Sequence, residues 1–212
     1  MTRRLPVYLL IDTSGSMFGE PIEAVRNGIQ LLQSSLASDP YALETAWISI
    51  ITFDTVAKQI TPLTEMPSFV PPTIEATGCT ALGGALKLLA ECIKKEVRRS
   101  TPDVKGDWRP LVFIMTDGVP TDDYQAGIEA VKQLRLGTIV GCCVGPHADD
   151  KVLKMITEDV VSLETADTST LRQFFKWIST TVSTKSASAP KTGDKQEGIT
   201  DLPPPPDVIS II

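Results

Sequence analysis

Hydrophobic residues along the chain follow two alternating patterns. Short, continuous apolar runs are typical of strands buried on both faces. They occur at residues 6–11, 46–53, 111–115, 138–144 and 160–163. Between these runs, apolar residues recur every three or four positions, which is typical of helices with one buried stripe. Such stripes occur at residues 22–36, 82–97, 128–134, 152–156 and 171–182.

This alternation predicts the fold class. Strands separated by single helices form a mostly parallel sheet with right-handed crossovers and helices on both faces. Residues 56–60 predict one more strand, paired with 46–53 as an antiparallel hairpin at a sheet edge. The expected fold is therefore a doubly wound, Rossmann-like α/β domain, in which binding sites lie at the carboxyl ends of the strands.

The length of the chain predicts one domain followed by a tail. Its 212 residues can bury one substantial core, and we expect the domain to cover residues 1–184. Residues 185–212 are rich in Ser, Lys and Pro and show no hydrophobic stripe, so a flexible Pro-rich tail is expected. Alternatively, the proline run and the terminal isoleucines dock on a partner as a short linear motif.

The charge of the chain and the length of its apolar runs disfavour two classes of partner, nucleic acids and membranes. A formal charge of −6 and a pI near 4.9 disfavour nucleic-acid binding, which depends on clustered cations. One basic cluster, Lys94, Lys95, Arg98 and Arg99, lies at the end of a predicted helix and is interpreted as a solvated helix end. No apolar run is long enough to span a bilayer, so no membrane association is expected.

The cysteines bear on the location of the chain. Cys79, Cys92, Cys142 and Cys143 include no Cys-x-x-Cys pair, which disfavours a zinc or redox motif. Reduced thiols in a cytoplasmic protein are the simplest interpretation. The apolar stretch before Asp12 is too short for a secretory signal and lacks a small-residue cleavage site, so we expect a cytoplasmic location.

Polar side chains follow two of the buried strands. Asp12, Ser14 and Ser16 come directly after the first strand, and Asp117 follows the strand at 111–115. Thr80 precedes a predicted helix, where its hydroxyl either caps that helix or turns toward the same sheet edge. These carboxylates and hydroxyls form an all-oxygen ligand set. Such a set selects one hard divalent cation, with Mg²⁺ expected and Mn²⁺ or Ca²⁺ as alternatives.

The ligand set also predicts what the ion does. Most of the ligands are neutral, so the ion keeps net positive charge and at least one exchangeable water. An Asp or Glu of another protein can replace that water. The sequence therefore predicts a metal-dependent protein-interaction module.

Three separate motifs resemble one known family. Asp12-x-Ser14-x-Ser16, Thr80 within Gly-Cys-Thr-Ala-Leu, and Asp117 within Thr-Asp-Gly are similar to the metal-ion-dependent adhesion site (MIDAS) of von Willebrand factor A-type (VWA) domains. The similarity spans roughly residues 5–183. It implies that the two serines and the threonine reach the ion directly, while the aspartates often bind it through water.

A narrower resemblance concerns residues 4–17, 52–54 and 111–122, which are similar to bacterial TerY-like proteins of tellurite-resistance and stress-response systems. It implies a cytoplasmic scaffold that works beside a Ser/Thr kinase and a metal-dependent, PP2C-type protein phosphatase. Some relatives carry a further C-terminal metal-binding segment. This chain has no cysteine after Cys143, which leaves the role of its tail open.

A Mg²⁺-dependent phosphohydrolase or nucleotide-acting enzyme is the main alternative, because Asp12 and Asp117 beside Mg²⁺ could support phosphoryl chemistry. The chain has neither a Walker loop nor a Gly-x-Ser-x-Gly elbow. His147 and Cys79 as a catalytic pair are disfavoured against an exposed turn histidine. A non-enzymatic module is therefore expected. In a third interpretation the metal is structural and the Pro-rich tail contacts the partner.

Three further residues have two interpretations each. Asp122 and Asp123 either add charge to the metal site or stabilise the first turn of the helix that follows them, and the second is favoured. Trp108 is the best candidate for an exposed interface anchor among the tryptophans, because Trp47 and Trp177 lie within predicted elements.

Overall fold

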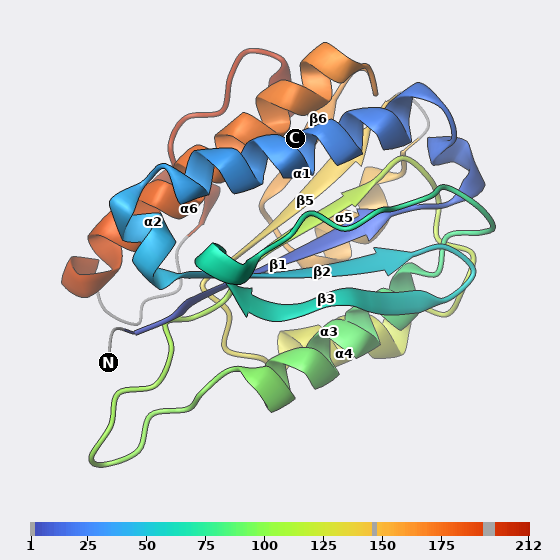
Figure 1. Ribbon diagram of the computed structural model, residues 1–212. Helices are drawn as coiled ribbons and strands as arrows, with labels where there is room; N and C mark the ends of the chain where they lie inside the picture. The colour runs from blue at the N-terminus through green and yellow to red at the C-terminus, as the bar shows by residue number, and fades with distance from the viewer. Residues whose placement is uncertain (1–2, 146–147, 193–197) are drawn as a thin grey trace.

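The computed structural model describes residues 3–145, 148–192 and 198–212. Within these ranges the chain forms a seven-stranded sheet with the strand order β3-β2-β1-β4-β5-β6-β7 (Figure 1). The strands are β1 (Leu5–Asp12), β2 (Ala46–Phe53), β3 (Ala57–Glu65), β4 (Leu111–Thr116), β5 (Thr138–Val144), β6 (Val160–Leu163) and β7 (Ile209–Ile211). The five central strands are parallel, and β3 and β7 are antiparallel to their neighbours.

Helices cover both faces of the sheet. One face carries α1 (Glu20–Ala37), α2 (Pro40–Thr45) and α6 (Thr168–Thr192), and α1 packs along α6 (Figure 1). The other face carries α3 (Leu82–Glu96), α4 (Gln125–Lys132) and α5 (Asp150–Ile156). Three short 3₁₀ turns complete the described elements: η1 (Gly15–Met17), η2 (Met66–Ser68) and η3 (Ile199–Asp201). The expected doubly wound fold is confirmed.

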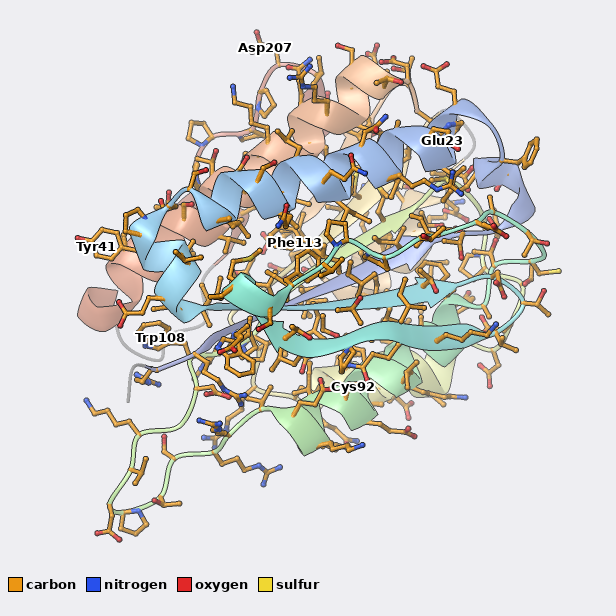
Figure 2. The ribbon with its side chains drawn as sticks, viewed as in Figure 1. Glu23, Tyr41, Cys92, Trp108, Phe113 and Asp207 are labelled. Atoms are coloured by element: carbon orange, nitrogen blue, oxygen red, sulfur yellow. The ribbon has the colours of Figure 1, made fainter. Side chains whose placement is uncertain are left out.

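Strand β1 shows why the sheet needs helices on both sides. All eight of its residues are buried. Because side chains alternate across a strand, Val7 and Leu9 enter the core beneath α1 and α6, while Tyr8 and Leu10 enter the core against α3 and α4. Phe113 of β4, labelled in Figure 2, lies in the first core. Its ring packs edge-to-face with that of Trp177 of α6.

The expected flexible tail differs from the structure. Helix α6 continues to Thr192, and residues 198–212 fold back onto the domain. Strand β7 pairs with β6, so the sheet has a second antiparallel edge that the sequence did not indicate. Trp177 Nε1 donates to the Pro203 carbonyl at 2.8 Å, and Ile199, Leu202 and Ile209 are buried. The segment was missed because its apolar residues have no regular period and its strand has only three residues.

Helix α2 is a second element that the sequence pattern did not indicate. Asp39 and Pro40 stand at its start. The Asp39 carboxylate accepts the backbone N–H of Tyr41 and of Ala42, each at 2.9 Å, and Pro40 occupies the first helical position.

Among the helices of the described ranges, none is long and apolar enough to cross a membrane.

The packing of α1 against α6 gives a prediction about Gly28. An Ala in place of Gly within a helix ordinarily stabilises by about 1 kcal/mol. Here a Cβ atom on Gly28 would lie 2.1 Å from the Phe175 ring, which is itself buried. We therefore expect Gly28→Ala to lower the free energy of unfolding by about 1–3 kcal/mol, measured by urea denaturation.

Gly84 of α3 provides the matched control, since a Cβ there meets only ordinary contacts at 3.7 Å or more. Gly84→Ala should stabilise the protein or leave it unchanged. Equal stabilisation by both substitutions would contradict the close packing of α1 on α6.

Candidate metal centre

Two neighbouring parallel strands bring the predicted carboxylates together. Asp12 ends β1 and Asp117 directly follows β4, and the register pairs Ile11 with Met115. Asp12 therefore lies beside Thr116, whose hydroxyl donates to Asp12 Oδ2 at 2.5 Å. Both of these residues are buried. The β1 and β4 loops thus leave the sheet side by side at its carboxyl edge.

Hydrogen bonds connect the β1 loop to the β4 loop. Asp12 Oδ1 accepts the backbone N–H of Ser14 at 2.8 Å, which folds the loop back over its own strand. The Ser14 and Ser16 hydroxyls lie 3.0 Å apart, and the Ser16 hydroxyl donates to Asp117 Oδ1 at 2.8 Å. The structure therefore brings these four predicted site residues into one connected group.

Thr80 reaches the same edge from the segment before α3. Its backbone N–H donates to Thr121 Oγ1 at 3.1 Å, and its carbonyl accepts the Thr121 backbone N–H at 2.9 Å. The Thr80 hydroxyl lies 3.5 Å from the position that a Cβ on Gly118 would take, so it faces the loop that carries Asp117. Among the described residues, no hydrogen bond uses this hydroxyl, which leaves it available to a ligand.

Gly78 holds the Thr80 segment against the β1 loop. Its carbonyl accepts the Gly15 N–H at 3.0 Å. Its φ of 72° lies in the left-handed region, and a Cβ there would approach Thr55 Oγ1 to 2.2 Å. Glycine is required at this position for both reasons. The three loops are therefore fastened to one another by backbone contacts as well as by the candidate ligands.

Burial affects both carboxylates. Desolvation raises the pKa of Asp12, opposed by hydrogen bonds from Thr116 and Ser14, and the charge of nearby Asp117 raises it further. Desolvation also raises the pKa of Asp117, opposed by the hydrogen bond from Ser16. Within the described ranges neither carboxylate forms an ion pair. A bound cation would favour the charged form of both groups.

The donor set fits a hard divalent cation. Two carboxylates and three hydroxyls supply only oxygen atoms, which suits Mg²⁺, Mn²⁺ or Ca²⁺. In the part of the chain that the structure describes, no group of three or more His, Cys, Asp or Glu could hold a metal. The candidate site has only two residues of these types, Asp12 and Asp117. Its other three donors are hydroxyls.

Several other sequence interpretations are tested by the structure. The Asp122 carboxylate caps α3, since it accepts the N–H of Gly83 at 2.9 Å and of Gly84 at 2.8 Å. Capping was expected, but of the helix that follows Asp122 in the chain. Asp123 lies before the N-cap Tyr124 of that helix, α4, and accepts the N–H of its first residue, Gln125, at 3.1 Å.

The expectation for Trp108 is wrong, because only 6% of this residue is exposed and Arg3 lies over its ring. Trp177, on α6, lies in the core. His147 lies outside the described residues. Thr116 and Thr121 were missed by the sequence reasoning. Thr116 could have been found from its position directly before Asp117, opposite the end of β1.

The fold and the three loops define a class of protein: a doubly wound domain that gathers hydroxyl and carboxylate oxygens from separate loops at the carboxyl edge of its sheet. The family model of the von Willebrand factor type A domain matches residues 7–177, and the chain belongs to this family. Comparison with curated proteins gives no match.

Solved structures share the fold. They include the PilB minor pilin from Streptococcus sanguinis (TM-score 0.66, 13% identity, 91% of this chain and 64% of that chain). A von Willebrand factor type A protein from Catenulispora acidiphila has a TM-score of 0.62 and 16% identity over 85% of this chain and 43% of that one. Proximal thread matrix protein 1 from the mussel byssus, with a zinc-occupied MIDAS motif, has a TM-score of 0.59 and 17% identity over 84% and 48%. The chain therefore spans between 43% and 64% of the length of these proteins.

Metal binding should stabilise the folded chain. A ligand that binds only the folded state at one hundred times its dissociation constant raises the free energy of unfolding by about 2.7 kcal/mol. We expect Mg²⁺ to produce such a rise in thermal unfolding, EDTA to reverse it, and Asp117→Asn to remove most of it.

Asp123→Asn is the control, because Asp123 is an exposed carboxylate near the same loop, and an Asn there can also accept the Gln125 N–H. A Mg²⁺ response that is the same in both variants would show that Asp117 is not a ligand.

Proposed function

We propose that this chain is a non-enzymatic protein-interaction module in which a divalent cation, held by Asp12, Ser14, Ser16, Thr80 and Asp117, receives an Asp or Glu from a partner protein. The observation that carries the proposal is the donor set: three neutral hydroxyls and two carboxylates at the open carboxyl edge of the sheet. The VWA family membership supports it, as does the zinc in the MIDAS motif of the mussel protein.

Each side chain has a defined part in this role. When bound, the cation supplies the positive charge that attracts the partner's carboxylate. Thr116 and the Ser14 backbone N–H fix the orientation of the Asp12 carboxylate. Ser16 positions Asp117 through their shared hydrogen bond. Because the two protein carboxylates at most balance a divalent charge, the partner's carboxylate meets little net repulsion.

Exposed apolar side chains beside the site supply contacts for the groups that flank this carboxylate. Phe18, two residues after Ser16, is 78% exposed, and Val119, two residues after Asp117, is 54% exposed. In a complex, such side chains would add buried apolar area around the polar contact. We therefore propose that the partner presents an acidic residue flanked by apolar ones.

The finer proposal concerns the identity of the partner. The resemblance of residues 4–17 and 111–122 to TerY-like proteins supports a cytoplasmic scaffold that joins a Ser/Thr kinase and a PP2C-type phosphatase in a bacterial stress or tellurite response. All four cysteines are free thiols, which accords with a reducing compartment. Co-purification of a kinase and a phosphatase with the tagged chain from its native cell tests this assignment.

The proposed module does not catalyse a reaction. This part of the proposal is supported by the sequence, which has neither a Walker loop nor a Gly-x-Ser-x-Gly elbow. Hydrolysis of a phosphoester or nucleotide by the isolated chain with Mg²⁺, abolished by Asp117→Ala, would contradict this part of the proposal.

For the alternative in which the tail alone binds the partner, the packing divides the tail, because Ile211 and Ile212 at its end are exposed while its earlier apolar residues are buried. Ile199, Leu202 and Ile209 are buried in the domain core. Deletion of 185–212 would therefore destabilise the domain itself, and it cannot serve as a clean test of tail binding.

Partner binding should depend on the metal. Proteins from the native cell that bind the immobilised chain with Mg²⁺ should be released by EDTA and should not bind the Asp117→Asn variant, while Asp123→Asn retains them. Quantitative mass spectrometry of the eluted proteins provides the measurement. Retention of the same proteins in EDTA would contradict a contact between the partner and the bound metal.

Phe18 separates partner affinity from metal affinity. We expect Phe18→Ala to weaken the captured partner by about 1–2 kcal/mol in a binding titration, while the Mg²⁺-induced stabilisation stays unchanged. Tyr41 is the matched control, because it is an exposed aromatic residue on α2, away from the metal edge (Figure 2). Equal losses from Phe18→Ala and Tyr41→Ala would contradict a binding surface beside the metal.

A further inference from the structure

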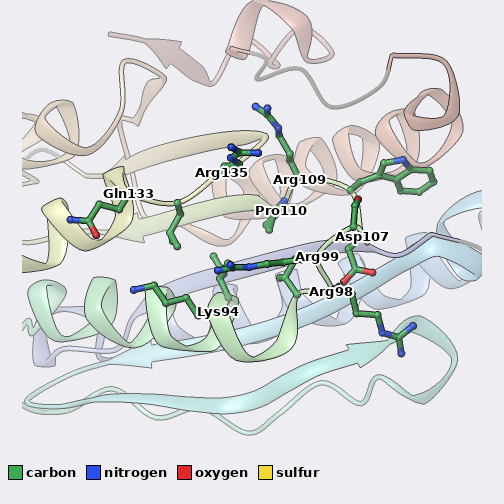
Figure 3. A pocket seen from close by; sticks show the side chains of 13 residues that line it. Lys94, Arg98, Arg99, Asp107, Arg109, Pro110, Gln133 and Arg135 are labelled. Carbon is green, nitrogen blue, oxygen red and sulfur yellow. Dashed lines mark hydrogen bonds between the residues drawn. The ribbon is translucent and has the colours of Figure 1, made fainter. Parts of the chain in front are cut away.

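A cavity of about 580 Å³ lies at the amino edge of the sheet, opposite the metal centre. Its walls come from the end of α3 and the residues after it, from the segment that leads into β4, and from the turn after α4 (Figure 3). Pro110 lines the cavity directly before β4, while Thr116 ends the same strand beside Asp12. Six residues of strand separate the two sites by about 20 Å.

The cavity gathers positive charge from three segments. Its lining includes five cationic side chains: Lys94, Arg98, Arg99, Arg109 and Arg135. Arg99 approaches from the α3 side, and Arg109 and Arg135 from the opposite side (Figure 3). In the sequence only the part near residue 95 was recognisable as a basic cluster. The fold adds Arg109 and Arg135, which are distant from it along the chain.

These cations have no anionic partner within the described residues. The ion pairs there are Arg4–Asp107, Arg26–Glu23 and Lys154–Asp150. Asp107 is the one carboxylate that lines the cavity, and its oxygens accept hydrogen bonds from the Arg4 guanidinium and the Arg98 backbone N–H. It is therefore already engaged, and the five cations keep their charge for another ligand.

Favourable interactions with helix dipoles do not explain why all five cations lie around the cavity. Lys94 lies in the last turn of α3, where a cation suits the helix dipole. Arg98 and Arg99 follow the C-cap, Arg109 lies next to a strand, and Arg135 lies beyond the last turn of α4. A chain with a net charge of −6 nevertheless places them around one cavity.

We propose that this cavity binds a compact anion that carries a polyphosphate group. Guanidinium groups match phosphate oxygens with paired hydrogen bonds, and several of them together favour more than one phosphate. The cavity has the volume of a small-molecule site, and Ile93, Val97 and Leu134 give it an apolar part that suits an organic group. An extended nucleic acid is disfavoured, because it needs a basic stripe and would be repelled by the acidic remainder of the surface.

The test is isothermal titration calorimetry of the full chain in EDTA, which removes any contribution from a metal at the other edge. The probes are sodium tripolyphosphate, ATP and adenosine. We expect saturable binding of tripolyphosphate and ATP, and none of adenosine alone. Tighter binding of ATP would identify a nucleotide as the ligand, while equal affinities would identify an inorganic polyphosphate.

The variant Arg99→Ala/Arg135→Ala removes two cavity cations and should weaken binding at least about tenfold. The control Lys95→Ala/Lys132→Ala removes two exposed cations from α3 and α4 that do not line the cavity, and it should change the affinity less than about twofold. Circular dichroism confirms that each variant is folded. Absence of saturable binding by the wild type, or equal losses in the two variants, would overturn the proposal.

Discussion

The parallel pairing of β1 with β4 is the constraint on which the metal centre depends. Ile11 lies opposite Met115, so Asp12 and Thr116 meet at the carboxyl edge and Asp117 follows at once. Side chains alternate along a strand, and a shift of one residue would turn Asp12 to the opposite face of the sheet. Apolar residues on both faces of β1 hold the strand between two cores, since Leu9 and Leu10 enter separate ones. Hydrophobic packing along the whole strand thus holds in place the strand that carries this carboxylate.

The sequence was informative wherever structure is encoded locally. Continuous apolar runs marked the parallel strands, and Asp12, Ser14, Ser16 and Asp117 were identified because they follow the ends of those runs. Thr116 was missed because the sequence analysis considered only candidate metal ligands after each apolar run, whereas Thr116 ends β4 and orients Asp12 through a hydrogen bond. The position of Thr80 depends on Thr121, 41 residues away. The assignment of these side chains as metal ligands remains a prediction.

The packing of the C-terminal segment also depends on contacts that the sequence pattern does not show. Strand β7 has three residues and owes its place to pairing with β6, in which Ile209 lies opposite Leu163. Ile199 and Leu202 enter the core from a 3₁₀ turn between polar and proline-rich stretches. Neither a period of two nor one of 3.6 residues is present to indicate burial. A composition typical of disorder therefore concealed residues that pack in the domain, because the composition does not show which surface they can cover.

The two edges of the sheet carry opposite charge, and the fold keeps them apart. Asp12 and Asp117 lie at the carboxyl edge, whereas Arg99, Arg109 and Arg135 surround the cavity at the amino edge. At physiological ionic strength the screening length is about 8 Å, well below the separation of about 20 Å given by β4. The cations around the cavity are therefore too distant to act as counterions for the buried carboxylates, whose pKa values are raised mainly by desolvation. In the functions proposed above, a divalent cation would supply the compensating charge at the carboxyl edge, and a polyphosphate group would supply it at the amino edge.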